Sequence, residues 1–97
     1  MIEIVRLSDG ITIRGHAGYA DHGNDIVCAG VSTLVQTLIQ SIEALTTDAI
    51  RYDIEPGYTN IEHGNLSDSG QLLIDSFFCG IELISGEYPD CVEITYY

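Results

Sequence analysis

Residues 25–45 read DIVCAGVSTLVQTLIQSIEAL, and this stretch decides the fold. Its apolar residues recur at spacings of three and four, which brings side chains onto one face of an α-helix. They are Val27, Val31, Leu34, Val35, Leu38, Ile42 and Leu45. Asp25 is a good N-cap, because its carboxylate can accept the free backbone N–H groups of the first turn. The pattern therefore predicts an amphipathic helix over about residues 26–46.

A hairpin is predicted on each side of this helix, because the flanking segments alternate between apolar and polar residues. Residues 1–16 turn at residues 8–10, which places His16 at the end of a strand. The second hairpin turns at Pro56 and Gly57, and its strands cover residues 51–55 and 58–63. Between the first hairpin and the helix lies a loop, a candidate lid beside reactive side chains.

A second helix is predicted to start at Asp68 or Ser69 and to end at Gly86. Its expected apolar side consists of Leu72, Leu73, Phe77, Ile81 and Ile84. Residues 91–97 alternate as a last strand. The order strand, strand, helix, strand, strand, helix, strand predicts an α+β fold, a two-layer sandwich with a mixed or antiparallel sheet packed on two helices.

The charge of the chain is unusual for its 97 residues, which we expect to form a single domain over 1–97. Three arginines stand against fifteen acidic residues, and the formal net charge is -12. Such a surface repels nucleic acid and anionic membranes and attracts a basic protein, although negative charge can also serve solubility alone. The first residues contain no apolar segment of signal-peptide length, so we expect a cytoplasmic location.

Cys28 lies in the first turn of the predicted helix. A thiol reacts as the thiolate, which a helix N-terminus or a neighbouring histidine favours, and the amides of the same turn could hold an oxyanion. Among the three histidines His16 is better placed to act as its base than His22, inside the loop, or His63, in the second hairpin. The alternative is a small buried thiol beside a solvated loop histidine.

Metal binding is a second interpretation of the same donors. His16, His22 and Cys28 are six residues apart and match no common zinc spacing, so we expect no metal and no cofactor. Three cysteines without a close pair also argue against a disulfide framework. Cys79 and Cys91 have apolar neighbours and are predicted to be core thiols.

Gly15-His16-Ala17, followed by residues 23–32 with the sequence GNDIVCAGVS, resembles the signature of the ribosomal-processing cysteine protease family, Prp. The histidine stands twelve positions before the cysteine. The resemblance implies that His16 is the general base and Cys28 the nucleophile of a catalytic dyad, and that Asp25 is the family's helix-capping aspartate. Whether Asp25 also orients His16 stays open at this point.

The same resemblance implies a residue beside the active site, a substrate-binding loop and a specific proteolytic function. Ser32 matches a serine one helical turn after the nucleophile, and Gly18 and Gly23 match a glycine-containing loop that opens for substrate. Family members remove a short N-terminal extension from the bacterial large-subunit ribosomal protein numbered twenty-seven, which supports ribosome assembly, and they are homodimers. The resemblance thus implies a cysteine endopeptidase with a basic ribosomal protein as substrate. The alternative is a non-catalytic ribosome-associated binding or assembly factor on the same fold.

Overall fold

The computed structural model describes residues 1–21 and 23–97, and its elements follow the predicted order. In chain order they are β1 (Ile2–Leu7), β2 (Gly10–Arg14), α1 (Ile26–Leu45), β3 (Ile50–Glu55), β4 (Tyr58–His63), α2 (Asp68–Glu87) and β5 (Val92–Tyr96). The predicted position of His22 in the loop lies outside the described residues.

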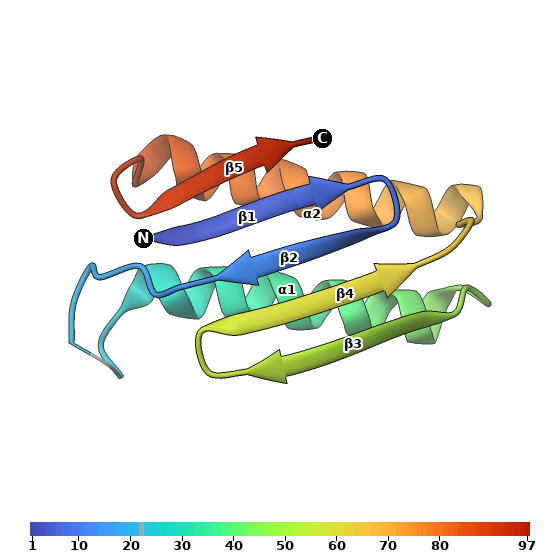
Figure 1. Ribbon diagram of the computed structural model, residues 1–97, viewed down its shortest axis with the longest axis horizontal. Coiled ribbons are helices and arrows are strands. Elements are labelled where there is room, and N and C mark those ends of the chain that lie inside the picture. The colour runs from blue at the N-terminus through green and yellow to red at the C-terminus, as the bar shows by residue number, and fades with distance from the viewer. Residues whose placement is uncertain (22) are drawn as a thin grey trace.

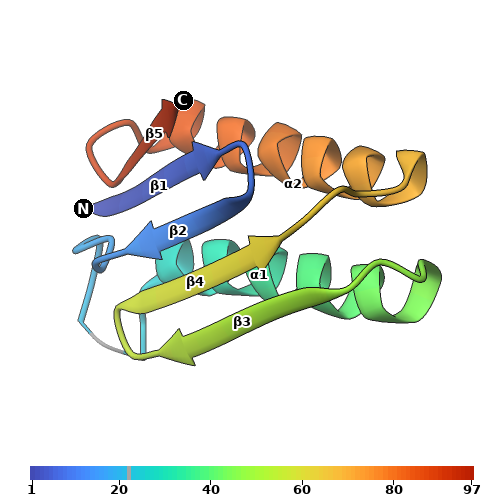
Figure 2. The same cartoon turned by 45° about the vertical axis from the view of Figure 1, so that its right-hand side comes forward.

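The five strands form one mixed sheet in the order β3-β4-β2-β1-β5. Strands β1 and β5 are parallel, and the other neighbours are antiparallel. Figure 1 shows α1 and α2 side by side on one face of the sheet, and the turned view in Figure 2 shows the same two layers. The predicted α+β sandwich on two helices is therefore confirmed, with a mixed sheet.

The core lies between the two layers, where branched apolar side chains from both hairpins meet the helices. Helix α1 buries Val27, Val31, Val35, Leu38, Ile39 and Ile42, which confirms most of its predicted apolar face. Leu45 was expected on that face but is 72% exposed. It is the last residue of the helix, where the chain turns away toward β3.

The apolar face of α2 differs from the prediction. Leu72, expected inside, is 68% exposed, whereas Ile74 and Phe78 are buried together with the predicted Phe77 and Ile81. The helix contains two overlapping sets of apolar residues, and the one that includes both phenylalanines faces the sheet. Cys79 follows Phe78 directly and is exposed, so the prediction of a core thiol at this position is wrong.

Gly86 does not end α2, contrary to expectation. The helix continues to Glu87, and the N–H of the capping residue Tyr88 donates to the carbonyl of Ile84 at 2.8 Å. Pro89 follows, and proline disfavours a helical backbone at the residue before it. The proline therefore explains the end of the helix better than the glycine does.

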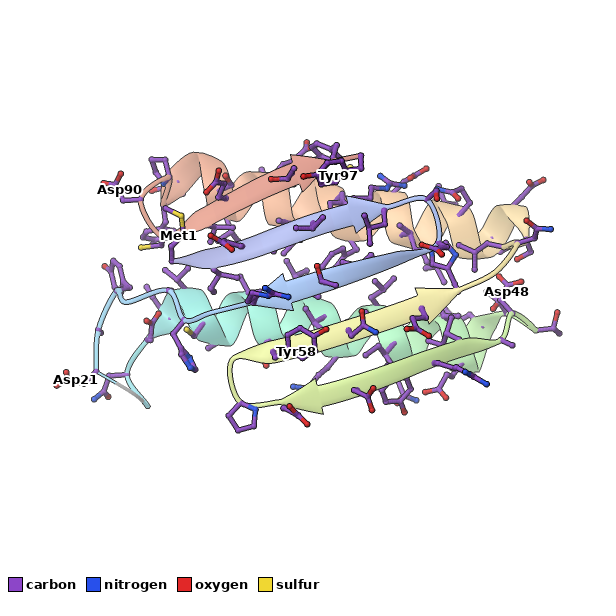
Figure 3. All side chains as sticks on the ribbon, in the orientation of Figure 1. Met1, Asp21, Asp48, Tyr58, Asp90 and Tyr97 are labelled. Carbon is purple, nitrogen blue, oxygen red and sulfur yellow. The ribbon has the colours of Figure 1, made fainter. Side chains whose placement is uncertain are left out.

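Several elements meet at the end of the molecule where α1 begins. Figure 1 shows the β3–β4 turn and the end of β2 close to this end of α1. Figure 3 shows Asp21 and Asp90 toward the same end, whereas Asp48 lies at the opposite one. The fold thus brings the end of β2, the start of α1 and the β3–β4 turn together.

Candidate active site

Helix α1 begins at a well-satisfied cap. Asp25 is the N-cap residue, and its Oδ1 accepts hydrogen bonds from the backbone N–H groups of Val27 and Cys28, both at 3.0 Å. Cys28 is therefore the third residue of the helix, at the position expected from the sequence. Its side chain lies in the turn where the helix dipole concentrates partial positive charge.

The other carboxylate oxygen of Asp25 holds the loop that precedes the helix. Oδ2 accepts hydrogen bonds from the backbone N–H of Tyr19 at 3.0 Å and of Ala20 at 3.4 Å. These hydrogen bonds, above all the one from Cys28, hold the pKa of Asp25 below its ordinary value, because they stabilise the charged form. Asp25 thus joins loop and helix, and both of its oxygens are occupied by backbone donors.

This arrangement changes one expectation about the first turn. The amides of Val27 and Cys28 were candidates for holding an oxyanion, but they donate to Asp25. An N–H group that is already bonded to a carboxylate is not free for a substrate oxygen. Asp25 therefore serves the helix end and the loop.

The sulfur of Cys28 has its own hydrogen-bond donor. The backbone N–H of Ala17 lies 3.2 Å from Cys28 Sγ and donates to it. Ala17 is buried, so this donor belongs to a packed part of the site. The hydrogen bond fixes the direction of the sulfur at the start of the helix. Sequence reasoning gave Ala17 no role, because its contribution comes from the backbone and carries no side-chain signal.

His16 is held at the end of β2 by the glycine before it. Gly15 has a φ of 95°, and a Cβ at this position would collide with the carbonyl oxygen of Met1. Its N–H donates to the carbonyl of Gly57 in the β3–β4 turn at 2.8 Å. The chain therefore leaves the sheet at a fixed angle and directs the imidazole toward the start of α1.

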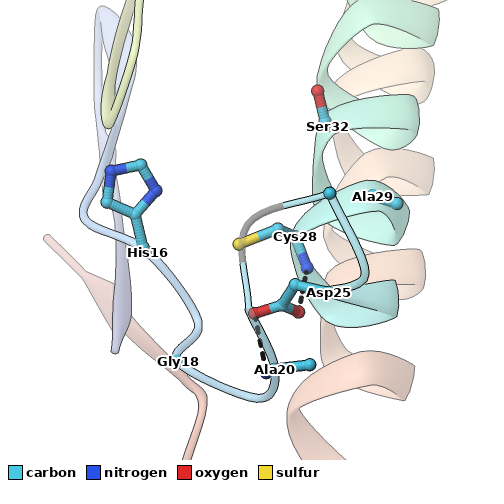
Figure 4. Close-up of a pocket in the computed structure, with 8 residues that line it drawn as sticks. His16, Gly18, Ala20, Asp25, Cys28, Ala29 and Ser32 are labelled. Atoms are coloured by element: carbon cyan, nitrogen blue, oxygen red, sulfur yellow. Dashed lines mark hydrogen bonds between the residues drawn. The ribbon is translucent and has the colours of Figure 1, made fainter.

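Figure 4 shows the His16 ring and the Cys28 sulfur facing each other across a pocket. Within the described residues no hydrogen bond joins the two side chains. The pocket has a volume of about 520 Å³ and is lined by His16, Gly18, Ala20, Gly23, Asp25, Cys28, Ala29 and Ser32. A catalytic hydrogen bond in a free enzyme is often long and shortens when substrate binds. The arrangement suits a nucleophile and base that come together around a substrate.

The pocket contains every residue that the sequence singled out for the substrate loop and the site. Gly18 and Gly23 have φ angles of 69° and 93°, which glycine adopts readily. Ser32 lies one turn after Cys28, and its Oγ accepts a hydrogen bond from Gln36 at 3.1 Å. Ser32 thus borders the pocket while its hydroxyl bonds within the helix.

A second cavity of about 390 Å³ shares His16, Cys28 and Ser32 with the first. It lies between α1 and the β3–β4 hairpin, and five isoleucine and valine side chains contribute to its wall: Ile2, Ile13, Val31, Val35 and Ile54. Ile54 is 52% exposed, so an apolar surface is open to solvent here. The reactive pair thus stands between a loop-lined pocket and an apolar cavity.

The remaining histidine and cysteines lie elsewhere. His63 ends β4 beside the start of β2, at the opposite end of the sheet from His16, and its Nδ1 lies 2.8 Å from the carbonyl of Gly64. Cys91 is half-buried and packs against the core. Among the described residues no group of three His, Cys, Asp or Glu side chains could hold a metal ion.

We expect Asp25→Asn to weaken the fold at neutral pH. The amide oxygen can still cap the helix, but its NH₂ group cannot accept the hydrogen bonds from Tyr19 and Ala20. A carboxyl with a lowered pKa stabilises the fold above its unfolded value of 3.8, and this stabilisation disappears as pH falls through the folded value. The thermal midpoint of Asp25→Asn should lie below wild type at about pH 7, and the difference should shrink toward about pH 3.

The control for this experiment is Asp53→Asn, which changes an exposed carboxylate on β3. Its midpoint should follow wild type over the whole pH range. A constant gap between Asp25→Asn and wild type from neutral to acid pH would contradict the account.

Comparison with known proteins shows that the chain is similar to a family of cysteine proteases. A family model described as cysteine protease Prp matches residues 2–93. The chain is 33% identical over 90 residues to the ribosomal processing cysteine protease Prp of Bacillus subtilis strain 168. The aligned region covers 86% of this chain and 80% of that protein. The chain is 29% identical over 89 residues to the Prp of Staphylococcus aureus strain NCTC 8325, and this aligned region covers 89% of this chain and 84% of that protein.

The fold of a solved relative agrees closely. The crystal structure of an essential ribosomal processing protease Prp from S. aureus, in complex with a covalently linked product peptide, superposes with a TM-score of 0.90. The superposition covers 99% of this chain and 97% of that chain at 23% identity. At this level of identity, the likeness to the solved structure shows a shared fold.

Proposed function

The chain belongs to the cysteine protease Prp family of ribosomal processing proteases, and we propose that His16 and Cys28 are its catalytic dyad. One observation carries the proposal. The Cys28 side chain lies in the first turn of α1, its sulfur accepts a hydrogen bond from the Ala17 N–H, and it faces the His16 ring across a pocket. The proposed substrate is the bacterial large-subunit ribosomal protein numbered twenty-seven, whose N-terminal extension is removed.

The mechanism is acyl transfer through the sulfur. His16 takes the proton of Cys28, and the thiolate attacks the carbonyl carbon of the scissile peptide bond. The tetrahedral intermediate then expels the amine of the mature ribosomal protein, which takes the proton back from His16. A thioester to the extension remains on Cys28, and a water molecule deprotonated by His16 releases it. The covalently linked product peptide of the S. aureus relative supports such a covalent route.

No third catalytic residue is needed for this scheme. Asp25 is the residue that the sequence left open as a candidate to orient His16, but its two oxygens accept hydrogen bonds from four backbone N–H groups. A carboxylate in that position stabilises the helix end and the loop rather than an imidazole. We therefore assign Asp25 to the architecture of the site.

The two cavities give a peptide a path across Cys28. The apolar cavity between α1 and the β3–β4 hairpin suits an apolar side chain of the substrate, because such a group would leave water for a largely aliphatic surface. Gly18, Gly23 and Ala20 leave little side-chain volume on the other side. A flexible extended peptide can therefore lie in the site with its backbone next to the thiol.

A homodimer in the cytoplasm remains part of the proposal. Residues 26–45 of α1 contain a single charged residue, Glu43, although the chain carries a net charge of -12. The exposed side of this helix is lined by Thr33, Gln36, Thr37, Gln40 and Ser41. A second copy could approach this uncharged side with little electrostatic repulsion.

Helix α1 is also long and apolar enough to cross a membrane by length and composition alone. Its buried apolar residues belong to the core, and the core helix of a globular domain can have the same length and composition. We therefore interpret its apolar character as core formation.

We expect the rate of cleavage to depend on salt. Ribosomal proteins are basic, and Asp25 and Glu55 contribute to the two cavities while Asp21 and Asp90 lie toward the same end of the molecule. Attraction between charges of opposite sign raises the association rate and is screened at high ionic strength. Raising NaCl from about 0.05 M to about 0.5 M should lower kcat/KM for the full-length precursor.

The control is a short neutral peptide that contains the same cleavage site. Its kcat/KM should change little with salt, because it lacks the positive charge of the ribosomal protein. Equal salt dependence of the two substrates, or none for the precursor, would show that charge does not guide the encounter.

The proposed function is tested by incubating the purified chain with the precursor and sequencing the products. We expect a single cut that removes the N-terminal extension. The competing function, a ribosome-associated assembly factor without catalysis, predicts binding of the precursor with no cut at any enzyme concentration.

A further inference from the structure

Gly57 is the second residue of the β3–β4 turn, and it faces both Gly15 and His16. Its carbonyl accepts the N–H of Gly15, the residue before His16, at 2.8 Å. A Cβ added to Gly57 would be 2.9 Å from His16 Nε2, 3.5 Å from Cε1 and 3.6 Å from Cδ2. Contacts under 3.0 Å are essentially absent around real Cβ atoms, so a side chain at position 57 requires a shift, and the imidazole, at the end of a flexible side chain, is the group that can move most easily.

These contacts also orient the ring. Nε2 is the imidazole atom closest to the added Cβ, and it therefore faces the β3–β4 turn. In Figure 4 a ring nitrogen points toward the Cys28 side of the pocket, and this nitrogen is then Nδ1. A side chain at residue 57 would compete with the ring for this space, so the glycine leaves room for the ring in the position in which Nδ1 faces the thiol.

We propose that Gly57 is a positioning residue, which holds the His16 ring with Nδ1 toward Cys28. The proposal rests on the function proposed above, in which His16 is the base for this thiol. Gly57 has no group that could act on a substrate, and it works through the imidazole alone. A displacement of about 1 Å between reacting groups can cost roughly a hundredfold in rate.

A simpler explanation must be separated from this one. Gly57 has a φ of 73°, so a substitution strains the turn whether or not the ring is displaced. Turn strain would lower stability without acting through His16, whereas displacement of the ring would change the reactivity of Cys28 only while His16 is present. A double-mutant cycle distinguishes the two.

The experiment measures the alkylation rate of Cys28 by iodoacetamide from about pH 5 to about pH 9, a range that spans the titration of free imidazole and thiol groups. The four proteins are wild type, Gly57→Ala, His16→Ala and the double variant, all in a Cys79→Ala, Cys91→Ala background that leaves one thiol. We expect Gly57→Ala to lower the rate at neutral pH by roughly tenfold or more and to move the pH profile toward that of His16→Ala. In the His16→Ala background, Gly57→Ala should change the rate by less than about twofold.

Two further variants keep the result interpretable. Gly57→Asn carries the same Cβ but tolerates a positive φ better, so it should fold more stably than Gly57→Ala and show the same altered profile. Gly64→Ala, at the other end of β4, has open space around its added Cβ and should match wild type.

The proposal is overturned if Gly57→Ala or Gly57→Asn keeps the wild-type alkylation profile, or if Gly57→Ala lowers the rate equally with and without His16. A failure of the proposed function is seen separately, as an absence of precursor cleavage by wild type. The coupling between Gly57 and His16 is measured without any substrate.

Discussion

Replacing Cys28 with alanine is expected to lower kcat/KM for the precursor by at least roughly 10⁴-fold, because no other group in the site can form the thioester. The variant should fold normally, since the side chain of Cys28 is only half-buried and the main change is the loss of one sulfur atom, which accepts a hydrogen bond from the Ala17 N–H. The measurement is the initial rate of extension removal, with protein integrity checked by thermal unfolding.

The matched control is Cys79→Ala, which removes an exposed thiol on α2. Its rate should equal that of wild type. Comparable losses in Cys28→Ala and Cys79→Ala would contradict the assignment, as would a Cys28→Ala protein that cuts at the wild-type rate.

Replacing His16 with alanine is expected to lower kcat/KM by roughly 10²- to 10⁴-fold, which is the usual contribution of general acid–base catalysis. The thiol, the Ala17 N–H and the cap at Asp25 all remain in this variant, so residual activity should exceed that of Cys28→Ala. The pH–rate profile should also lose the limb that reports the imidazole. Both quantities come from initial rates measured across the pH range.

His63→Ala is the control for this variant, because His63 lies at the opposite end of the sheet. It should keep the rate and the pH profile of wild type. Loss of the same limb in His63→Ala, or an unchanged profile in His16→Ala, would show that another group acts as the base.

Much of the fold was predictable because its elements are local. The 3.6-residue periodicity after Asp25 defined α1, and alternation around Pro56 defined the second hairpin. The errors arose where two signals compete within one element. In α2 the residues around Leu72 and those around Phe78 both satisfy a helical period, and only the sheet decides which set is buried.

The pairing of the strands could be predicted less well from the sequence. That β5 runs parallel to β1 depends on contacts between the two ends of the chain, and no local pattern encodes them. The choice between a mixed and an antiparallel sheet could therefore not be made from the residues alone.

The candidate site shows a similar division. Local patterns placed Cys28 in a capped first turn and His16 at the end of a strand. The family resemblance then implied that the two residues form a catalytic dyad. The N–H of Ala17 and the bare backbone of Gly57 could not be found in this way, because glycine and alanine carry no chemical signal at those positions. For Gly57 the sequence offered a turn, and the structure adds the proximity of that turn to His16.

The central claim is that this chain cuts its substrate through a thioester on Cys28. A single-turnover reaction with enzyme in excess over precursor, quenched in acid and followed by intact mass and peptide mapping, tests it directly. The account predicts a transient addition of the extension to Cys28, with loss of the amine product, that hydroxylamine removes. Release of the extension at the same rate by wild type and Cys28→Ala, with no addition at Cys28, would contradict it.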